Sequence, residues 1–403
     1  MIKIGLIREG KIPLDKRVPL TPLQAKQVKD RFDVSLVVQS SQVRCFDDQN
    51  YADLGVEVVD AVDDCDVLLG VKEVPVAMLI PGKTYFFFSH TIKKQAYNRK
   101  LLNAILEKKI TLIDWETLID ENGNRVIAFG RWAGIVGAYN GLWTYGQRYN
   151  LYSIRRANEC FNYADLKTEY VKIQLPTIKI AITGGGRVAK GAIEVLLGIG
   201  IRQVTPHDFL EKTLNEPVFT QLNIRDYNKH KEGSDFRRSE FYSQPELYES
   251  DFGRYAKITD LLIACAFWDP AAPVLFHKED IIRKDFNIKV IADITCDIEG
   301  SIPSTKKPST IDDPIYDYNP SDDQVEQPLT DEANITVMAV DNLPCELPRD
   351  ASESFGNEFI KNVLPALLGK DEKKTIEKAT ITKEGNLTKD YKYLQDFVKG
   401  GHQ

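Results

Sequence analysis

The sequence predicts an α/β protein made of two doubly wound parallel-sheet domains separated by a cleft. Apolar, strand-like runs alternate with helix-like segments in both halves of the chain, which is the pattern of a parallel sheet covered by helices. A glycine-rich loop at 184–186 joins one of these strands to a helix. The chain has 403 residues, which exceeds the size at which one hydrophobic core keeps growing, so two domains are expected.

The first third of the chain alternates between strands and helices. A helix should begin at Thr21-Pro22, because threonine caps helices and proline is favoured at the first helical position. A second helix is expected from about Asn98 to Glu107. The predicted strands are 4–7, 34–38, 67–71, 85–88 and 110–113.

The remaining two thirds predict a long helix and then a second alternating unit. Small and aromatic residues mix over 129–145, which suits a helix that packs closely against its neighbours. We interpret the polar and aromatic segment at about 211–255 as an insertion, and 301–331, rich in Pro, Ser, Thr and Asp, as a long irregular segment. A helix at about 354–368 should rejoin the first domain. The predicted strands are 178–182, 201–204, 261–266, 290–294 and 335–340.

These elements predict a discontinuous first domain, residues 1–140 plus 345–403, which would hold the substrate and the catalytic groups. Residues 141–344 would form the second domain, of Rossmann type, with the insertion at about 211–255. Both domains are expected to be Rossmann-like.

Composition indicates a globular protein that binds small molecules. Hydrophobic residues make up 43% and charged residues 28%, and the net charge of -7 argues against nucleic-acid binding. The six cysteines stand singly, without the spacing of a zinc site, so no metal is expected. No apolar run approaches membrane-spanning length, and charges interrupt the N-terminus, so we expect a cytoplasmic protein without a membrane partner.

The loop at 184–189 matches the dinucleotide-binding pattern G-x-G-x-x-A between a strand and a helix. The first glycine allows a tight turn, the second lets the backbone approach a pyrophosphate, and the helix N-terminus offers unpaired N–H groups. Asp208, just past the next strand, could hold the adenosine ribose hydroxyls. The alternatives are a glycine-rich turn without a ligand and, for Asp208, a helix cap. The loop residues are Gly184, Gly185, Gly186, Arg187, Val188 and Ala189.

Two residues at predicted strand ends suit proton transfer. Lys72, followed by Glu73, comes after the run 67–71, and desolvation there could move the lysine pKa toward a range useful for a general base. His90 ends the run 85–90, at the carboxyl end of the next predicted strand, and is the best placed of five histidines for proton transfer near neutral pH. The alternatives are a solvated lysine at a strand end and a histidine that is hydrogen-bonded in the core.

Two arginines could hold carboxylates by bidentate hydrogen bonds. Arg17 precedes the first helix and Arg125 precedes an apolar run. The alternative for each is a solvated surface arginine.

The chain resembles the lysine-forming saccharopine dehydrogenases, also called lysine–2-oxoglutarate reductases, within the alanine dehydrogenase and transhydrogenase superfamily. The resemblance spans nearly the whole chain, although the glycine loop is spaced as in alanine dehydrogenase and differs from the fungal saccharopine enzymes. The motifs that carry it are Gly70-Val71-Lys72, Lys83-Thr84-Tyr85, the run Phe87 to Lys93, Arg125-Val126, Trp132-Ala133-Gly134 and Asp341-Asn342-Leu343-Pro344.

The resemblance implies the reversible, NAD(P)-dependent condensation of L-lysine and 2-oxoglutarate to saccharopine. Lys72 and His90 match the acid-base pair of that family, and Glu73 and Glu116 match the acidic residues that tune it. Cationic residues at the positions of Arg17, Lys93 and Arg125 hold substrate carboxylates in the family, and an aspartate at the position of Asp341 borders the nicotinamide. Asn342 and Leu343 belong to the same cofactor-side motif.

Other activities and the choice of cofactor stay open at this point. An alanine dehydrogenase-like enzyme shares Lys72, Glu73, His90 and the glycine loop, and a dinucleotide-binding regulator without catalysis would also keep that loop. Asp208 favours NAD on charge grounds, whereas Arg187 could contact the 2′-phosphate of NADP. NAD is the expected cofactor, with NADP possible. The sequence does not predict the oligomeric state.

Overall fold

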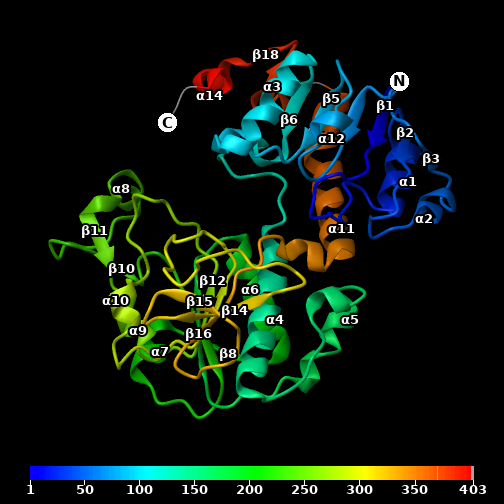
Figure 1. Ribbon diagram of the computed structural model, residues 1–403. Coiled ribbons are helices and arrows are strands. Elements are labelled where there is room, and N and C mark those ends of the chain that lie inside the picture. Colours follow the sequence, from blue (N-terminus) through cyan, green and yellow to red (C-terminus); the bar gives the residue numbers. More distant parts are fainter. Residues whose placement is uncertain (370, 401–403) are drawn as a thin grey trace. The chain divides into compact units, whose positions relative to one another are not determined.

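The computed structural model describes residues 1–369 and 371–400. The chain forms two compact units, Met1–Phe129 with Pro348–Gln403, and Gly130–Leu347, and each contains one eight-stranded sheet (Figure 1). Residues 401–403, the end of the range predicted for the first domain, lie outside the described residues. No helix in the described part of the chain is long and apolar enough to cross a membrane.

The sheet of the first unit is parallel except at one edge, where β17 and β18 run antiparallel. Its central strands are buried on both faces, as expected of parallel strands covered by helices. In order across the sheet the strands are β18 (Asn386–Leu387), β17 (Thr380–Lys383), β6 (Thr111–Asp114), β5 (Thr84–Phe87), β4 (Val67–Leu69), β1 (Ile2–Leu6), β2 (Val34–Gln39) and β3 (Glu57–Val59).

Local signals explain the helices of the first unit. The Thr21 side chain accepts a hydrogen bond from the Gln24 N–H, and the Gln24 side chain accepts one from the Thr21 N–H, which confirms the predicted cap. One face of α3 buries Leu101, Leu102 and Ile105 in the core. The helices are α1 (Pro22–Arg31), α2 (Asp48–Ala52), α3 (Arg99–Glu107), α11 (Pro348–Glu358), α12 (Leu364–Leu368), α13 (Thr375–Ala379) and α14 (Gln395–Lys399).

The sheet of the second unit is also mostly parallel, with β14 and β15 antiparallel at one edge. In order across the sheet the strands are β15 (Gln324–Glu326), β14 (Ile315–Asn319), β16 (Ile335–Met338), β13 (Val290–Asp293), β12 (Leu261–Ala264), β7 (Lys179–Thr183), β9 (Val218–Leu222) and β8 (Arg202–Val204). The helices are α4 (Gly130–Tyr149), α5 (Tyr163–Lys167), α6 (Arg187–Ile199), α7 (Pro206–Glu211), α8 (Arg238–Ser243), α9 (Gly253–Ala256) and α10 (Lys278–Ile281).

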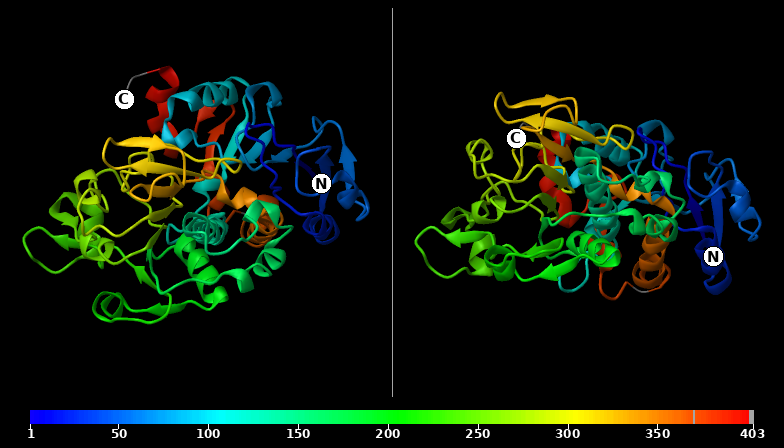
Figure 2. Two further views of the ribbon diagram at one scale, coloured as in Figure 1. Left: turned by 60° about the horizontal axis from the view of Figure 1, so that its bottom comes forward. Right: turned by 90° about the horizontal axis from the view of Figure 1, so that it is seen from below.

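Two predictions for the second unit were wrong in part. The segment 301–331, predicted to be irregular, contributes β14 and β15, because the short run Ile315–Asn319 buries Tyr316 and Tyr318 within a stretch that is otherwise rich in Pro and Asp. The predicted insertion at 211–255 contains β9, a strand inside the main sheet. What lies outside this sheet is the small pair β10 (Asn228–His230) and β11 (Tyr248–Ser250) with α8, at the margin of the second unit in both views of Figure 2.

Glycines bring the backbones of α4 and α6 into contact. A Cβ atom on Gly134 would lie 1.9 Å from the Val188 carbonyl oxygen, and one on Gly191 would lie 2.1 Å from the Arg131 carbonyl oxygen. Each helix therefore needs a glycine where the other crosses it. All of α4 belongs to the second unit, so the predicted domain boundary at residue 140 falls inside this helix.

Candidate functional site

The carboxyl ends of three neighbouring parallel strands gather most of the predicted catalytic residues of the first unit. In the sheet β4 pairs with β5, and β5 pairs with β6, so the segments that follow the three strands leave from the same edge. Lys72 and Glu73 follow β4, His90 follows β5 and Glu116 follows β6. Ligands of open α/β sheets bind at this edge.

His90 is held by Glu73. The His90 Nδ1 atom lies 2.7 Å from Glu73 Oε1, and the Lys11 ammonium group donates to the other carboxylate oxygen. Burial alone would raise the pKa of Glu73, but the hydrogen bonds from His90 and Lys11 outweigh it and lower the pKa to about 2. Because an ionised carboxylate can only accept, the imidazole carries its proton on Nδ1. Nε2 is then the ring atom left to exchange a proton with a ligand.

The backbone around His90 is fixed by buried polar groups. His90 has φ 54° and ψ 11°, a left-handed conformation that costs free energy in a residue with a Cβ atom and is often found at functional sites. The neighbouring Ser89 donates from its N–H to Asp114 Oδ2 at 2.9 Å, and Asn98 Nδ2 donates to the His90 carbonyl oxygen at 3.2 Å. Burial raises the pKa of Asp114, opposed by its hydrogen bonds from Ser89 and Glu116.

Lys72 lies beside a carboxyl group that the sequence analysis missed. The backbone N–H groups of Val71 and Lys72 donate to Glu9 Oε1 at 2.6 Å and Oε2 at 2.9 Å. Burial and the nearby Asp15 carboxylate nevertheless raise the pKa of Glu9 to about 8. Glu9 and Glu73 thus flank Lys72 with pKa values displaced in opposite directions, an arrangement that lets one edge hold a neutral acid and a stable anion at the same pH.

Glu116 joins the two exposed cations of the predicted substrate site. Arg125 Nη2 lies 2.6 Å from Glu116 Oε1, and Lys93 Nζ lies 3.8 Å from the same oxygen. The side chains of Arg125 and Lys93 are 50% and 47% exposed, whereas that of Glu116 is 10% exposed. The second oxygen of Glu116, Oε2, is buried without a hydrogen-bond partner. This cluster therefore offers two accessible cations near His90.

Arg17 is buried in the same unit. Its Nε and Nη2 atoms donate to the two Asp15 oxygens at 3.0 and 2.6 Å, and its guanidinium lies 4.2 Å from the centre of the Phe129 ring. Only 3% of Arg17 is exposed. The alternative of a solvated surface arginine is therefore wrong for Arg17, while Arg125 is half-exposed.

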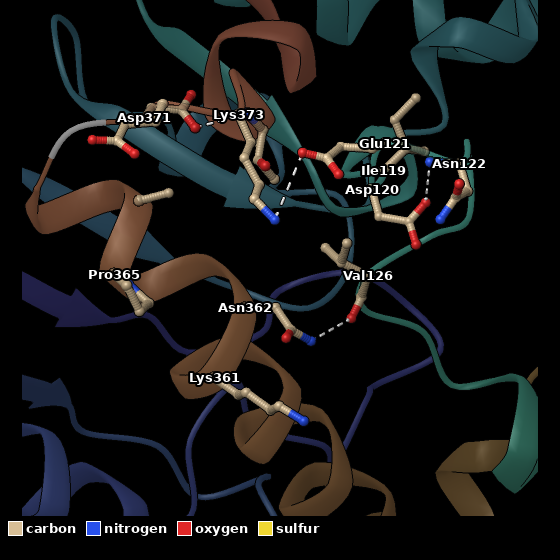
Figure 3. A pocket seen from close by; sticks show the side chains of 13 residues that line it. Ile119, Asp120, Glu121, Asn122, Val126, Lys361, Asn362, Pro365, Asp371 and Lys373 are labelled. Carbon is tan, nitrogen blue, oxygen red and sulfur yellow. Dashed lines mark hydrogen bonds and ion pairs between the residues drawn. The ribbon is translucent and has the colours of Figure 1, made fainter.

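A separate pocket of the first unit lies at the hairpin that carries Arg125. It encloses about 540 Å³, and its walls come from 119–126 and from the segment 361–375 (Figure 3). Carboxylates face lysines across it, with Lys373 Nζ 3.7 Å from Glu121 Oε1. Among the described residues, its lining does not include Lys72 or His90.

The glycine loop of the second unit fits a pyrophosphate. Gly184 has φ 97°, and a Cβ atom there would lie 3.1 Å from the backbone of Ala266, so only glycine suits the turn. Gly186 is the N-cap of α6, and a Cβ atom on it would meet nothing within 4 Å. Ala189 is buried within α6. A dinucleotide pyrophosphate requires a tight glycine turn and open space in front of a helix N-terminus, and this loop has both.

The other predicted cofactor residues lie apart from this loop in the chain. Asp208 is in the first turn of α7, where its N–H donates to Thr205 Oγ1 at 3.0 Å and its carboxylate pairs with Lys212 Nζ at 3.0 Å. Asp341 is exposed and follows β16, and Leu343 is buried in the next turn. Burial and then the Asp341 carboxylate raise the pKa of the Cys296 thiol to about 12.

Glu9, Lys11 and Asp15 are the residues of this edge that the sequence analysis did not select. All three follow β1, which lies beside β4 in the sheet. The rule used for Lys72 and His90, that polar residues after a parallel strand gather at one edge, would have found Glu9. Lys11 and Asp15 lie on an irregular stretch whose path no periodic pattern predicts.

Two family models match the chain. Residues 5–136 match the alanine dehydrogenase/PNT N-terminal domain, and residues 167–395 match the alanine dehydrogenase/PNT C-terminal domain. The chain belongs to the alanine dehydrogenase/PNT family.

Curated relatives of this alanine dehydrogenase/PNT chain are named α-aminoadipic semialdehyde synthase or saccharopine dehydrogenase. It is 29% identical to the α-aminoadipic semialdehyde synthase of Arabidopsis thaliana and 30% identical to the mitochondrial synthase of Mus musculus, each over 97% of the chain. It covers 41% and 47% of those proteins, so it spans less than half their length. It is also 27% identical to saccharopine dehydrogenase [NAD(+), L-lysine-forming] of Yarrowia lipolytica, over 90% of the chain and 92% of that protein.

Solved structures of the family share the fold. An L-alanine dehydrogenase matches with a TM-score of 0.64 and 17% identity, over all of both chains. A transhydrogenase from Sinorhizobium meliloti matches with a TM-score of 0.57 and 15% identity, over 96% of this chain and all of that one. These likenesses confirm the predicted α/β fold.

Proposed function

We propose that this protein is a nicotinamide-dinucleotide-dependent oxidoreductase that reversibly joins L-lysine and 2-oxoglutarate to form saccharopine. The fungal relatives that carry this activity in their names align over about nine tenths of both chains. The plant and animal synthases align over 97% of this chain but under half of their own length, so their full activities are not carried over.

One observation supports the proposal most strongly: the carboxyl edge of the first sheet combines an oriented imidazole with accessible cations. The His90 ring is oriented by its hydrogen bond with Glu73. Lys93, three residues further along the chain, and Arg125 both contact the Glu116 carboxylate. Condensing an amine with a keto acid needs groups that move protons and groups that neutralise carboxylates. The proposed substrates bring three carboxylates, two from 2-oxoglutarate and one from lysine.

The residues of this edge have separate roles in the proposed reaction. The substrate carboxylates bind to three cations, Arg125, Lys93 and Arg17. In the free protein these cations pair with the carboxylates of Glu116 and Asp15, and the substrate takes over part of that pairing. Glu73 remains ionised and keeps the His90 proton on Nδ1. His90 Nε2 and Lys72 then exchange protons with the reacting nitrogen and oxygen.

The chemical balance requires these proton transfers. The ε-amine of lysine adds to the ketone carbon, one proton moves from the nitrogen to the oxygen, and a second protonation of the resulting hydroxyl lets water depart and leaves a protonated imine. A reduced nicotinamide, when bound, would supply the hydride that adds to the carbon of this protonated imine, which gives the secondary amine of saccharopine. In the opposite direction the same groups activate the water that hydrolyses the imine.

The second unit supplies the proposed dinucleotide site. Gly184, Gly185 and Gly186 leave room for the pyrophosphate, and the first turn of α6 offers its N–H groups. Asp341, Asn342 and Leu343 border the nicotinamide in this proposal, by analogy with the family motif.

A substrate screen tests the proposed function. Oxidation of reduced dinucleotide is followed optically with lysine plus 2-oxoglutarate, and in parallel with pyruvate plus ammonia. We expect oxidation that needs both lysine and 2-oxoglutarate. Turnover only with pyruvate and ammonia would favour an alanine dehydrogenase, and dinucleotide binding without turnover on either pair would favour a regulator without catalysis.

A further inference from the structure

The strand order of the second sheet separates Asp208 from the glycine loop. β7 is hydrogen-bonded to two strands, β12 on one side and β9 on the other, and it pairs with β9 in register from Lys179 with Val218 to Thr183 with Leu222. β8, the strand that Asp208 follows, lies beyond β9 at the edge of the sheet. In the strand order 3-2-1-4-5-6 of a dinucleotide-binding fold, the residue that binds the adenosine ribose follows strand 2, which lies next to strand 1 on the side away from strand 4. Here β7 precedes the glycine turn, β12 takes the place of strand 4, and the neighbour on the ribose side is β9.

Contacts of the glycine loop agree with this assignment. The Gly184 N–H donates to the Leu222 carbonyl oxygen at 2.8 Å, and Gln221 Nε2 donates to the Gly184 carbonyl oxygen at 2.9 Å. A Cβ atom on Gly185 would lie 2.8 Å from Asn223 Oδ1. The end of β9 thus presents uncharged amide side chains to the loop.

The turn that follows β9 carries an exposed cation. The Asn223 N–H donates to Asp226 Oδ2 at 2.7 Å, and the Asp226 N–H donates back to the Asn223 carbonyl oxygen at 2.8 Å. Arg225 Nε lies 3.8 Å from Asp226 Oδ1, so both carboxylate oxygens face a donor. The Arg225 side chain is 74% exposed. The Asp226 carboxylate is thus engaged by donors of its own turn, and the Asn223 amide and the Arg225 guanidinium are the groups of this turn that can bind a phosphate.

An apolar pocket continues from the same turn. Ile224, the residue between Asn223 and Arg225, lines it together with Thr183 at the end of β7 and Ala266 beyond β12. Four aromatic residues are part of its wall: Tyr227, Phe241, Phe267 and Trp268. A planar base suits such a lining. The pocket therefore adjoins the polar turn through Ile224 and the start of the glycine loop through Thr183, as a base, a ribose and a pyrophosphate joined in one dinucleotide require.

We propose that the turn Asn223–Asp226, and not Asp208, determines the choice of dinucleotide, and that Asn223 and Arg225 bind a ribose 2′-phosphate. The preferred cofactor is then NADP(H). This inference rests on the proposed function, because it requires that the second unit bind a nicotinamide dinucleotide. It also gives the segment after β9 a role, since Tyr227 and Phe241 contribute to the adenine side of the site.

Equilibrium binding of NADP⁺ and NAD⁺ to the full chain, by titration calorimetry without substrates, tests the inference independently of turnover. We expect the wild-type protein to bind NADP⁺ at least about tenfold more tightly than NAD⁺ at low salt, a difference worth one good ionic contact. Arg225→Gln and Asn223→Asp should each reduce that ratio by about tenfold through weaker NADP⁺ binding, with NAD⁺ affinity unchanged. The ratio should also fall as salt screens the phosphate.

Two matched variants separate this inference from its rivals. In both Asp208→Asn and Arg202→Gln, the latter on β8, the ratio of NADP⁺ affinity to NAD⁺ affinity should stay within about twofold of the wild-type ratio. Tighter binding of NAD⁺ by the wild type, or a ratio that moves in Asp208→Asn and not in Asn223→Asp, would overturn the inference. If NADH alone supports lysine-dependent turnover, the proposed function stands and this inference falls. If neither dinucleotide binds, both fall.

Discussion

The carboxyl edges of the two sheets satisfy their polar groups in different ways. At the edge of the first sheet, charged side chains pair with one another, as Glu73 does with His90 and Glu116 does with Arg125. At the edge of the second sheet, the glycine loop offers backbone groups and open space, with Gly184 packed against the backbone of Ala266. The first edge is suited to moving protons and neutralising carboxylates, and the second to receiving a polyphosphate.

The comparison also predicts how each edge fails. A site made of titratable side chains should lose activity when one functional group is replaced, without losing its shape. A site made of backbone should tolerate neutral changes of side chain and fail when a Cβ atom is added.

The largest effect should come from the proposed acid-base pair, Lys72 and His90. Lys72→Met and His90→Gln should each lower kcat by about 10²- to 10⁴-fold, the usual contribution of a positioned acid or base. Dinucleotide affinity should change by less than about twofold, since both residues belong to the first unit. Steady-state kinetics and dinucleotide titration measure the two quantities.

Lys26→Met is the matched control, because Lys26 is an exposed lysine of α1 that pairs with Asp30. It should leave kcat unchanged. Full turnover in both Lys72→Met and His90→Gln would remove the assignment of the pair.

The two carboxyl groups beside Lys72 should give opposite pH dependences of stability. The pKa of Glu73 is lowered to about 2 from an ordinary value of 4.5, so its contribution is complete above about pH 5 and is lost as pH falls toward 2. The pKa of Glu9 is raised to about 8, so the folded state is favoured below about pH 4.5 and loses that advantage as pH rises through 8. At about 1.4 kcal/mol per pKa unit, the contribution is of the order of 3 kcal/mol for Glu73 and 5 kcal/mol for Glu9.

Chemical unfolding between pH 3 and pH 9 measures both contributions. Glu73→Gln should flatten the acid side of the stability profile, and Glu9→Gln should flatten the neutral to alkaline side. Glu57→Gln, on an exposed residue of β3, serves as the control. Identical profiles for Glu9→Gln and the wild type would contradict the account of the Lys72 environment.

A methyl group on the glycine turn should damage the second edge. Gly184→Ala places a Cβ atom against Ala266 in a left-handed backbone conformation, a strain of about 1–3 kcal/mol, and should weaken dinucleotide binding by about tenfold to a hundredfold. Gly200→Ala has a similar positive φ, 93°, but would meet nothing within 4 Å. That variant should lose stability and keep its affinity. Equal losses of affinity in both would argue against a cradle at Gly184.

The smallest effect should come from the exposed cation of the first edge. Arg125→Ala should change the unfolding free energy by less than about 1 kcal/mol, because its ion pair with Glu116 is half-exposed. It should raise the KM for 2-oxoglutarate by about tenfold, the value of one charge-assisted contact. Arg131→Ala removes a comparable exposed ion pair, with Glu194, and should leave KM unchanged. A KM that does not respond to Arg125→Ala would exclude this arginine from the substrate site.

Sequence patterns predicted most of the fold because parallel strands and their helices leave strong periodic signals. The strands around Lys72 and His90 and the cap of α1 at Thr21 were found in this way. β9 and β14 were missed, because short strands inside polar segments carry too few apolar residues to stand out. Strand order is set by tertiary pairing, so the exclusion of Asp208 from the neighbourhood of β7 could not be read from its spacing.

The candidate site was likewise predictable only in part: most of its residues were selected, but several of their contacts were not. The resemblance selected Glu73 and Glu116, and the structure shows that Glu73 contacts His90 and that Glu116 contacts Lys93 and Arg125. The bidentate pair of Arg17 with Asp15 depends on an irregular stretch, so no pattern predicted it. The raised pKa of Glu9 follows from burial, which only the folded chain reveals.

The most direct test of the central claim is the fate of the transferred hydride. The protein is supplied with lysine, 2-oxoglutarate and dinucleotide deuterated at the transferable position, and the products are analysed by mass spectrometry. We predict one deuterium in a product that contains the carbon skeletons of both substrates, and its loss in Lys72→Met and His90→Gln. Deuterium in a product of 2-oxoglutarate alone, or a condensation product that persists in both variants, would contradict the account.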